Sequence, residues 1–206
     1  GFLTLLSFLR SNNIHITYID LLNPSSQDIE ALPPKKKYGT GKFLTEEIEK
    51  PEAYKDIHRV YRRHGMPPAV LREKLKNIKP PDLILMTSIM TYWYGGVFEA
   101  VSVCKERFPD IPLILGGNYV SLCQEHAQAY SGADYIFSGD WRGGFLPLTA
   151  KLLDIDLTEP GEDIFSAQDL YENSDTAVMR FTSGCPFNCD YCASERLSGK
   201  FRQRSP

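Results

Sequence analysis

Short apolar runs alternate with segments of helical periodicity over residues 83–153. The runs are Leu83–Met86, Pro112–Leu115 and Asp134–Ser138, each bounded by turn-forming residues. Runs of this length and character are typical of strands buried on both faces of a parallel sheet. The segments between them place apolar residues three and four positions apart, as helices do. The alternation of strand and helix predicts a doubly wound, parallel α/β sheet.

The helical stripes define which residues of these segments we expect in the core. The first stripe comprises Tyr94, Val97, Val101, Cys104 and Phe108, and the second comprises Val120, Cys123 and Ala127. Because Cys104 and Cys123 lie on apolar faces, we interpret both as small core residues. His126 is interpreted as an ordinary helix side chain. A last helix is expected over Phe145–Leu153.

The pattern before residue 80 predicts further elements. These are a helix from Phe2 that ends before Asn12, a strand over Ile14–Asp20, a helix over Pro51–His64 that ends at Gly65, and a short helix that begins at Pro67. We therefore expect one α/β domain over residues 1–153, with a helical insertion over about 24–80. An acidic linker, 154–175, precedes a second segment, 176–206, which opens with a strand over Ala177–Thr182.

Composition is ordinary for a globular protein, with 206 residues, of which 42% are hydrophobic and 24% charged. The net charge of -3 does not indicate a positively charged surface that would bind nucleic acid or an anionic membrane. Basic residues gather at Lys35–Lys37, Arg59–His64 and Lys200–Arg204. Each group can be a solvated face or a linker, and we favour that interpretation for Lys35–Lys37. No secretory signal and no long apolar stretch occurs, so we expect a cytoplasmic protein without a membrane span.

Three cysteines near the carboxyl end form the most specific motif. They lie in the run GCPFNCDYC over residues 184–192. The spacing C-x3-C-x2-C allows Cys185, Cys189 and Cys192 to converge on one iron–sulfur cluster, because thiolate is the ligand that such clusters require. Three ligands on a four-iron cluster leave one iron open.

With this spacing, and with Tyr191 before the last cysteine, the chain resembles the radical S-adenosylmethionine enzymes. The resemblance implies a 4Fe–4S cluster on the three cysteines, whose open iron binds the amino and carboxylate groups of S-adenosylmethionine. It also implies an electron donor of flavodoxin or ferredoxin type, release of a 5'-deoxyadenosyl radical, and sensitivity to oxygen. Tyr191 is expected near the adenine, and Phe187 is expected to pack against the cluster loop.

Other uses of the cysteines are less favoured. A zinc site needs four ligands, and no Cys or His follows Cys192. A disulfide framework is disfavoured because five cysteines is an odd number and the chain has no secretory signal. A two-cluster ferredoxin would carry a fourth cysteine followed by proline, which is absent.

Small and polar residues follow the predicted strands of the first domain. They are Thr87, Ser88, Gly116, Gly117 and Gly139. Ligands of open parallel sheets bind at this edge, and paired glycines let a large ligand approach the backbone. Their order resembles the cobalamin-binding, Rossmann-type domain that precedes many radical S-adenosylmethionine barrels. The chain lacks the Asp-x-His-x-x-Gly string that supplies an axial cobalt ligand in one version of that domain.

The resemblance implies that the chain is a fragment. It begins without Met, the usual first strand of the sheet would lie upstream of Gly1, and residues 176–206 would form only the first strand and cluster loop of a partial β/α barrel. The expected activity is cobalamin-assisted methyl transfer or rearrangement. Two alternatives remain: a cobalamin-independent enzyme that abstracts hydrogen, with the first domain as a scaffold, and a fragment that binds cofactors without catalysis.

Overall fold

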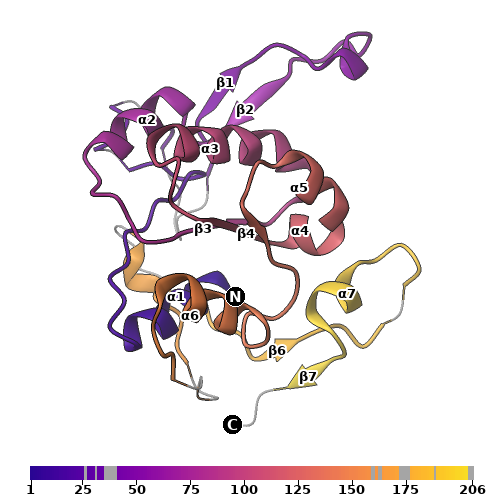
Figure 1. Ribbon diagram of the computed structural model, residues 1–206. Helices are drawn as coiled ribbons and strands as arrows, with labels where there is room; N and C mark the ends of the chain where they lie inside the picture. The colour runs from indigo at the N-terminus through magenta and orange to yellow at the C-terminus, as the bar shows by residue number, and fades with distance from the viewer. Residues whose placement is uncertain are drawn as a thin grey trace. The chain divides into compact units, whose positions relative to one another are not determined.

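The computed structural model describes residues 1–25, 27–30, 32–34, 41–158, 161, 164–171, 177–187 and 189–203 (Figure 1). The chain divides into two compact units. Unit 1 comprises Gly1–Ile16, Pro80–Gln168 and Ala177–Pro206, and unit 2 comprises Thr17–Lys79 and Asp169–Thr176. No helix among the described residues is long and apolar enough to cross a membrane.

A parallel sheet of three strands forms the centre of unit 1. Strands β3 (Ile84–Ser88), β4 (Leu113–Gly117) and β5 (Tyr135–Ile136) lie in this order. Each predicted apolar run therefore contributes a parallel strand, so the predicted α/β class is confirmed. The apolar residues of β4 are almost completely buried, whereas those of β3 are half-buried. The core is thus centred on β4.

Helices follow each strand, as the periodicity predicts. They are α3 (Tyr94–Arg107), preceded by the short 3-10 helix η3 (Thr91–Trp93), α4 (Asn118–Leu122), α5 (Gln124–Tyr130) and α6 (Phe145–Leu153). The α3 stripe is buried at Val97, Val101 and Cys104, which confirms this part of its predicted core face. The prediction is wrong for Tyr94, which lies at the first position of the helix and is 41% exposed. The second predicted helix is interrupted at Cys123, whose extended φ of -131° separates α4 from α5.

Helix α1 (Phe2–Ser11) opens unit 1 and ends as predicted. Its apolar face is buried, and the ring of Phe8 packs on Trp141 with centroids 5.3 Å apart. The side chain of Asn12 caps the end of the helix by donating to Phe8 O at 3.0 Å, and it also accepts two hydrogen bonds from Thr158. The described start of the predicted linker is therefore attached to α1.

The predicted strand over Ile14–Asp20 is wrong. Its residues do alternate between half-buried and exposed, as in Ile14, His15 and Ile16. No strand pairs with this segment within the described part of the chain. The segment therefore alternates in burial as a strand does but forms no hydrogen bonds to a neighbouring strand. The segment ends at Asp20, whose carboxylate accepts the N–H groups of Leu22 and Asn23 in a turn.

The predicted helix over Pro51–His64 is also wrong. Unit 2 instead contains a hairpin of β1 (Thr45–Glu47) and β2 (Arg62–His64), whose connection carries the 3-10 helix η2 (Glu52–Tyr54). The apolar spacing that suggested a helical face has another cause, because Tyr54 and Tyr61 stack across the connection with centroids 6.2 Å apart.

Helix α2 (Pro68–Lys76) completes the regular structure of unit 2 and confirms the short helix predicted after Pro67. Proline at the first helical position is favourable there because its missing N–H would have no intrahelical acceptor. Leu71 and Leu75 bury one side of the helix. The elements that remain are the 3-10 helix η4 (Gln168–Leu170), β6 (Thr182–Ser183), α7 (Ser194–Ser198) and β7 (Arg202–Gln203).

Candidate functional site

The cysteine motif lies in a loop whose two ends are held together. Strands β6 and β7 pair antiparallel, with Thr182 opposite Gln203, and Cys185 forms a further bridge with Lys200. The strand predicted over Ala177–Thr182 is therefore much shorter than expected. Only Thr182 of that range belongs to a strand, and its partner is antiparallel.

Gly184 allows the chain to turn tightly into the motif. Its φ is +74°, and a Cβ at this position would lie 2.5 Å from Lys200 O and 2.6 Å from Gly199 O. An L-residue would thus be strained and would collide with the returning chain. The glycine before Cys185 therefore has a structural reason that is independent of any ligand.

The three thiols of the motif are free and accessible to different degrees. Cys185 is partly exposed, whereas Cys189 and Cys192 are exposed. A backbone hydrogen bond of 2.9 Å from Cys192 N to Cys189 O forms a turn between them. Hydrogen bonds from the side chain and the backbone of Ser194 lower the pKa of the Cys192 thiol, with 3.0 Å between Sγ and Oγ. Asn188, inside the motif, lies outside the described residues.

The donor set fits an iron–sulfur cluster by its chemistry, since three thiolates on one loop are what a four-iron cluster with one open iron requires. The three thiols do not converge as closely as metal ligands do. In the described ranges, no group of three or more Cys, His, Asp or Glu side chains is arranged to hold a metal ion. The rings beside the thiols are also open. Phe187 is 75% exposed and Tyr191 is 93% exposed. The expected packing of Phe187 against the loop is therefore wrong.

A second set of predicted residues meets at the carboxyl ends of β3 and β4. The parallel register places Thr87 beside Gly116 and Ser88 beside Gly117, so the sheet brings these four together. Ser88 is buried, and its hydroxyl donates to Met90 O at 3.1 Å. Its side chain is therefore already engaged within the protein.

Gly117 is required by the packing of the sheet. Its φ is +93°, and a Cβ there would fall 2.5 Å from both Ser88 O and the Oγ1 of Thr87. At Gly116 a Cβ would approach Phe137 O to 3.3 Å. The Gly-Gly pair that the sequence links to a ligand is thus explained, at least at Gly117, by close contact between neighbouring strands.

Gly139 differs from this pair. It follows β5 and has φ +111°, but no atom lies within 4 Å of the position that its Cβ would take. The loop after β3, on the other side of β4, exposes large apolar side chains, with Ile89 60% and Tyr92 70% exposed. The carboxyl ends of the strands therefore include open space at Gly139 and exposed apolar surface after β3.

Helix α4 connects the two sets of residues. It begins directly after Gly117 and packs against η3, which follows β3, and against α7, which follows the cysteine motif. In Figure 1, α7 is drawn in yellow next to α4. Because all these elements belong to unit 1, the helix that follows the cysteine motif and the carboxyl ends of β3 and β4 adjoin the same short helix.

An aromatic cluster around His126 is formed by helices α3, α4 and α5. It was not predicted from the sequence. The hydroxyl of Tyr119 is 2.7 Å from His126 Nδ1, and the rings of Tyr94 and Phe98 pack on the imidazole. The pKa of the Tyr119 hydroxyl is raised, mainly because the side chain is buried. The available signal was the spacing of seven residues between Tyr119 and His126, which corresponds to about two turns of the single helix predicted there. The interruption at Cys123 leaves the two side chains on separate helices, α4 and α5.

Comparison of the chain with protein-family models, with curated proteins and with solved structures finds no match in any of the three.

Proposed function

We propose that this chain is part of a radical S-adenosylmethionine enzyme, with a 4Fe–4S cluster held by Cys185, Cys189 and Cys192. The observation that carries the proposal is the C-x3-C-x2-C motif, whose thiols are all free and lie on one loop. Such thiolates bind iron–sulfur clusters. The contact of α7 with α4 supports the proposal further, because it brings the loop to the sheet edge where a second ligand would bind.

The residues of the loop have separate tasks in this proposal. The three thiolates bind the cluster, and Gly184 permits the turn that returns the chain against Lys200. When bound, such a cluster would supply one electron to S-adenosylmethionine, which would cleave to methionine and a 5'-deoxyadenosyl radical. The exposed ring of Tyr191 offers a face on which the adenine can stack. A small flavodoxin or ferredoxin is the proposed electron donor.

The cluster is tested by anaerobic reconstitution of the chain with iron and sulfide. We expect about four irons per chain and the broad visible absorbance of an iron–sulfur cluster. Replacing Cys185, Cys189 or Cys192 by Ala should reduce the iron content strongly. Cys123→Ala is the matched control, since Cys123 lies between α4 and α5, and it should leave the iron content unchanged.

Three outcomes would contradict the cluster. These are a four-iron spectrum in all three motif variants, loss of iron in Cys123→Ala, and stoichiometric zinc in place of iron in protein purified without added metal. Binding of S-adenosylmethionine by the reconstituted chain then tests the open iron, and dithionite-dependent formation of 5'-deoxyadenosine tests cleavage.

A second ligand is proposed for the sheet edge of unit 1. We infer that cobalamin binds there, beside Thr87, Ser88, Gly116, Gly117 and Gly139. The observations in favour are the exposed apolar surface of Ile89, Met90 and Tyr92 after β3 and, separately, the open space at Gly139 after β5, because a corrin is broad and largely apolar. With cobalamin, the proposed reaction is methyl transfer or a rearrangement.

Retention of hydroxocobalamin after desalting tests this second proposal. We expect stoichiometric corrin absorbance in the wild-type chain and about tenfold weaker binding in Ile89→Glu, because the substitution places a charge against the apolar ligand. Phe165→Glu is the control, since Phe165 is 73% exposed in the linker region. No retention by a folded, cluster-loaded protein would favour a hydrogen-abstracting enzyme that uses the first domain as a scaffold.

A further inference from the structure

The outer edge of strand β2 in unit 2 carries backbone groups that no strand pairs. In an antiparallel pair, alternate residues point their N–H and C=O groups at the partner strand. Ile48 N donates to Tyr61 O at 3.1 Å, so Tyr61 faces β1. By alternation Arg62 and His64 face away from β1, and no other strand in the described ranges covers that side. Such an edge can accept an extended peptide as an added strand.

This edge is basic. Residues 58–64 contain three arginines, two histidines and no carboxylate. Arg63 is engaged by Glu46 at 2.9 Å across the hairpin. Arg59 and Arg62 are exposed, and neither forms an ion pair with a carboxylate in the part of the chain that the structure describes. Two cations are therefore available along one side of β2.

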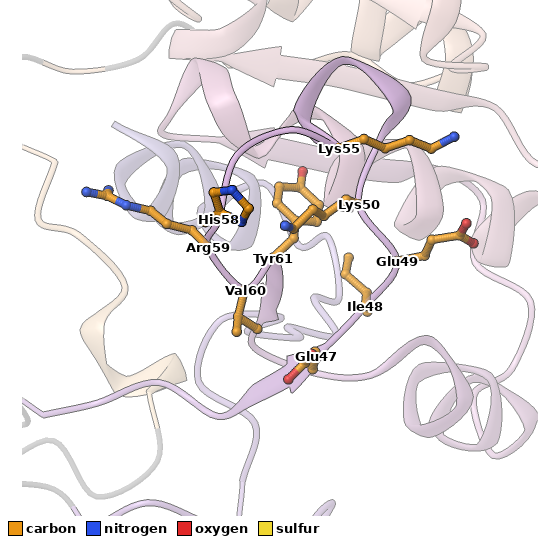
Figure 2. A pocket seen from close by; sticks show the side chains of 9 residues that line it. All are labelled: Glu47, Ile48, Glu49, Lys50, Lys55, His58, Arg59, Val60 and Tyr61. Carbon is orange, nitrogen blue, oxygen red and sulfur yellow. The ribbon is translucent and has the colours of Figure 1, made fainter.

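A hollow lies beside the basic edge, and the apolar residues among those that line it are Ile48, Val60 and Tyr61. Tyr54, Ile57, Val60 and Tyr61 are between 37% and 49% exposed, which is unusual for four apolar residues of one hairpin. The hollow has a volume of about 590 Å³ and is lined by residues 47–50, 55 and 58–61. In Figure 2, Lys50 and Tyr61 lie within the loop, whereas Arg59 points outward. The amino group of Lys50 donates to Ile57 O at 2.6 Å and so helps to hold the loop in shape.

The distribution of charge selects among possible partners. Over residues 45–64 the charges balance: the acidic residues are Glu46, Glu47, Glu49, Glu52 and Asp56, and the basic ones are Lys50, Lys55, Arg59, Arg62 and Arg63. A nucleic acid or an anionic bilayer that covered the hairpin would meet as many carboxylates as cations. Pairing of β2 with β2 of a second copy would set arginines against arginines, which is unfavourable. A peptide strand that pairs with β2 and does not cover the rest of the hairpin meets only its basic side.

We propose that the outer edge of β2 binds an extended, acidic segment of a partner protein by strand addition. The backbone of the segment pairs with Arg62 and His64, its carboxylates bind Arg59 and Arg62, and an apolar side chain enters the hollow beside Tyr61. The inference is independent of the proposed cluster chemistry, because all of its residues lie in unit 2.

Fluorescence anisotropy with labelled peptides tests the inference on the whole chain. The probes are an octapeptide of alternating glutamate and valine and its lysine–valine counterpart, measured at an ionic strength of about 0.15 M. We expect the acidic peptide to bind at least about tenfold more tightly than the basic one. The double substitution Arg59→Glu with Arg62→Glu should reverse this order. Lys79→Glu, which changes an exposed cation elsewhere in unit 2, should preserve it.

Two further probes separate strand addition from simple charge attraction. An acidic peptide with every backbone nitrogen methylated retains its carboxylates but cannot donate to the edge, so we expect it to lose binding. An oligothymidylate of eight nucleotides should bind no better than the basic peptide. Strand addition is overturned if the methylated peptide or the oligonucleotide binds as tightly as the acidic peptide. It is equally overturned if the wild-type chain does not distinguish the acidic peptide from the basic one.

Discussion

Gly117 shows how one residue is constrained by its neighbours in the sheet. Its φ of +93° and the 2.5 Å approach of a Cβ to Ser88 O leave room only for glycine. We expect Gly117→Ala to lower the free energy of unfolding by about 3 kcal/mol, because it combines backbone strain with a collision against main chain. Urea denaturation followed by circular dichroism measures the effect.

Two other glycines provide matched controls for this prediction. Gly139→Ala should cost only about 1 kcal/mol, since its φ is positive but the surrounding space is open. Gly96→Ala, in helix α3 with no neighbouring atom within 4 Å, should stabilise the protein by about 0.5–1 kcal/mol through helix propensity. Equal losses at Gly117 and Gly139 would show that contact with Ser88 is unimportant.

Cys104 gives a pH dependence at the residue scale. Burial raises the pKa of its thiol to about 11, whereas the thiol ionises near 9 when the chain is unfolded. The unfolded chain thus loses the proton first as the pH rises, so the free energy of unfolding should fall between about pH 9 and 11.

Urea denaturation at pH 8 and pH 10 measures this loss, which we expect to be about 1 kcal/mol for the Cys104 contribution. Because other groups also titrate in this range, the informative quantity is the difference between the wild type and Cys104→Ala. An identical pH dependence in the two proteins would show that Cys104 ionises equally easily in the folded and unfolded chain.

At the scale of elements, helix α2 is joined to an earlier loop of unit 2 by one partly buried ion pair. Lys74 Nζ lies 2.6 Å from Asp28, whose side chain is only 11% exposed. Burial alone would raise the pKa of Asp28, but hydrogen bonds from Lys74 and Ser25 outweigh it and lower the pKa below its usual value. The carboxylate therefore stabilises the folded unit when it is ionised.

Asp28→Asn should reduce the free energy of unfolding by about 1–2 kcal/mol at pH 7. The difference from the wild type should diminish as the pH falls below about 4, because the wild-type carboxyl then takes up a proton. Denaturant titrations at pH 7 and pH 3 measure it. Glu73→Gln removes the exposed pair with Lys76 and should cost no more than about 0.5 kcal/mol; a larger loss there than at Asp28 would contradict the role of burial.

At the scale of the whole molecule, the division into two units predicts separate responses to core substitutions. Leu115 in β4 is fully buried in unit 1, and Leu75 in α2 is 4% exposed in unit 2. We expect Leu115→Ala to reduce hydrogen-exchange protection in β3 and β4, with a loss of about 2–5 kcal/mol, and to leave α2 unchanged. Leu75→Ala should have the opposite pattern.

Hydrogen exchange followed by mass spectrometry of peptides resolves the two units. The exposed substitution Lys79→Glu controls for changes that do not affect a core. If either core substitution lowers protection to the same extent in both units, the chain unfolds as one cooperative body and the prediction is contradicted.

The parallel sheet was predictable from the sequence because local signals agreed. Leu113 and its neighbours form a continuous apolar run that ends in two glycines, and the run became the buried strand β4. Helix α6 lies at the predicted residues, since its apolar spacing and the preceding Gly143–Gly144 pair mark the same boundary.

The segment over Ile14–Asp20 and the hairpin of unit 2 were not predictable in the same way, although helix α2 was. The segment over Ile14–Asp20 has the alternation of a strand, but a strand also needs a partner, and alternation says nothing about partners. Conversely, Tyr54 and Tyr61 have helical spacing although they belong to a hairpin connection. A short apolar pattern fits both periods, and only the pairing of β1 with β2 decides between them.

The candidate site divides along the same line. The sequence alone determined the type and spacing of the thiols at Cys185, Cys189 and Cys192, the position of glycines after the strands, and the parallel α/β class, because these depend on residues close together in the chain. Tertiary structure alone decided that α7 packs on α4 beside the sheet edge, that Gly117 is needed for contact with Ser88, and that β2 keeps a free basic edge. The physical reason is that contacts between residues distant in sequence depend on how the chain packs. The local pattern of residues does not specify which distant segments pair or in which register.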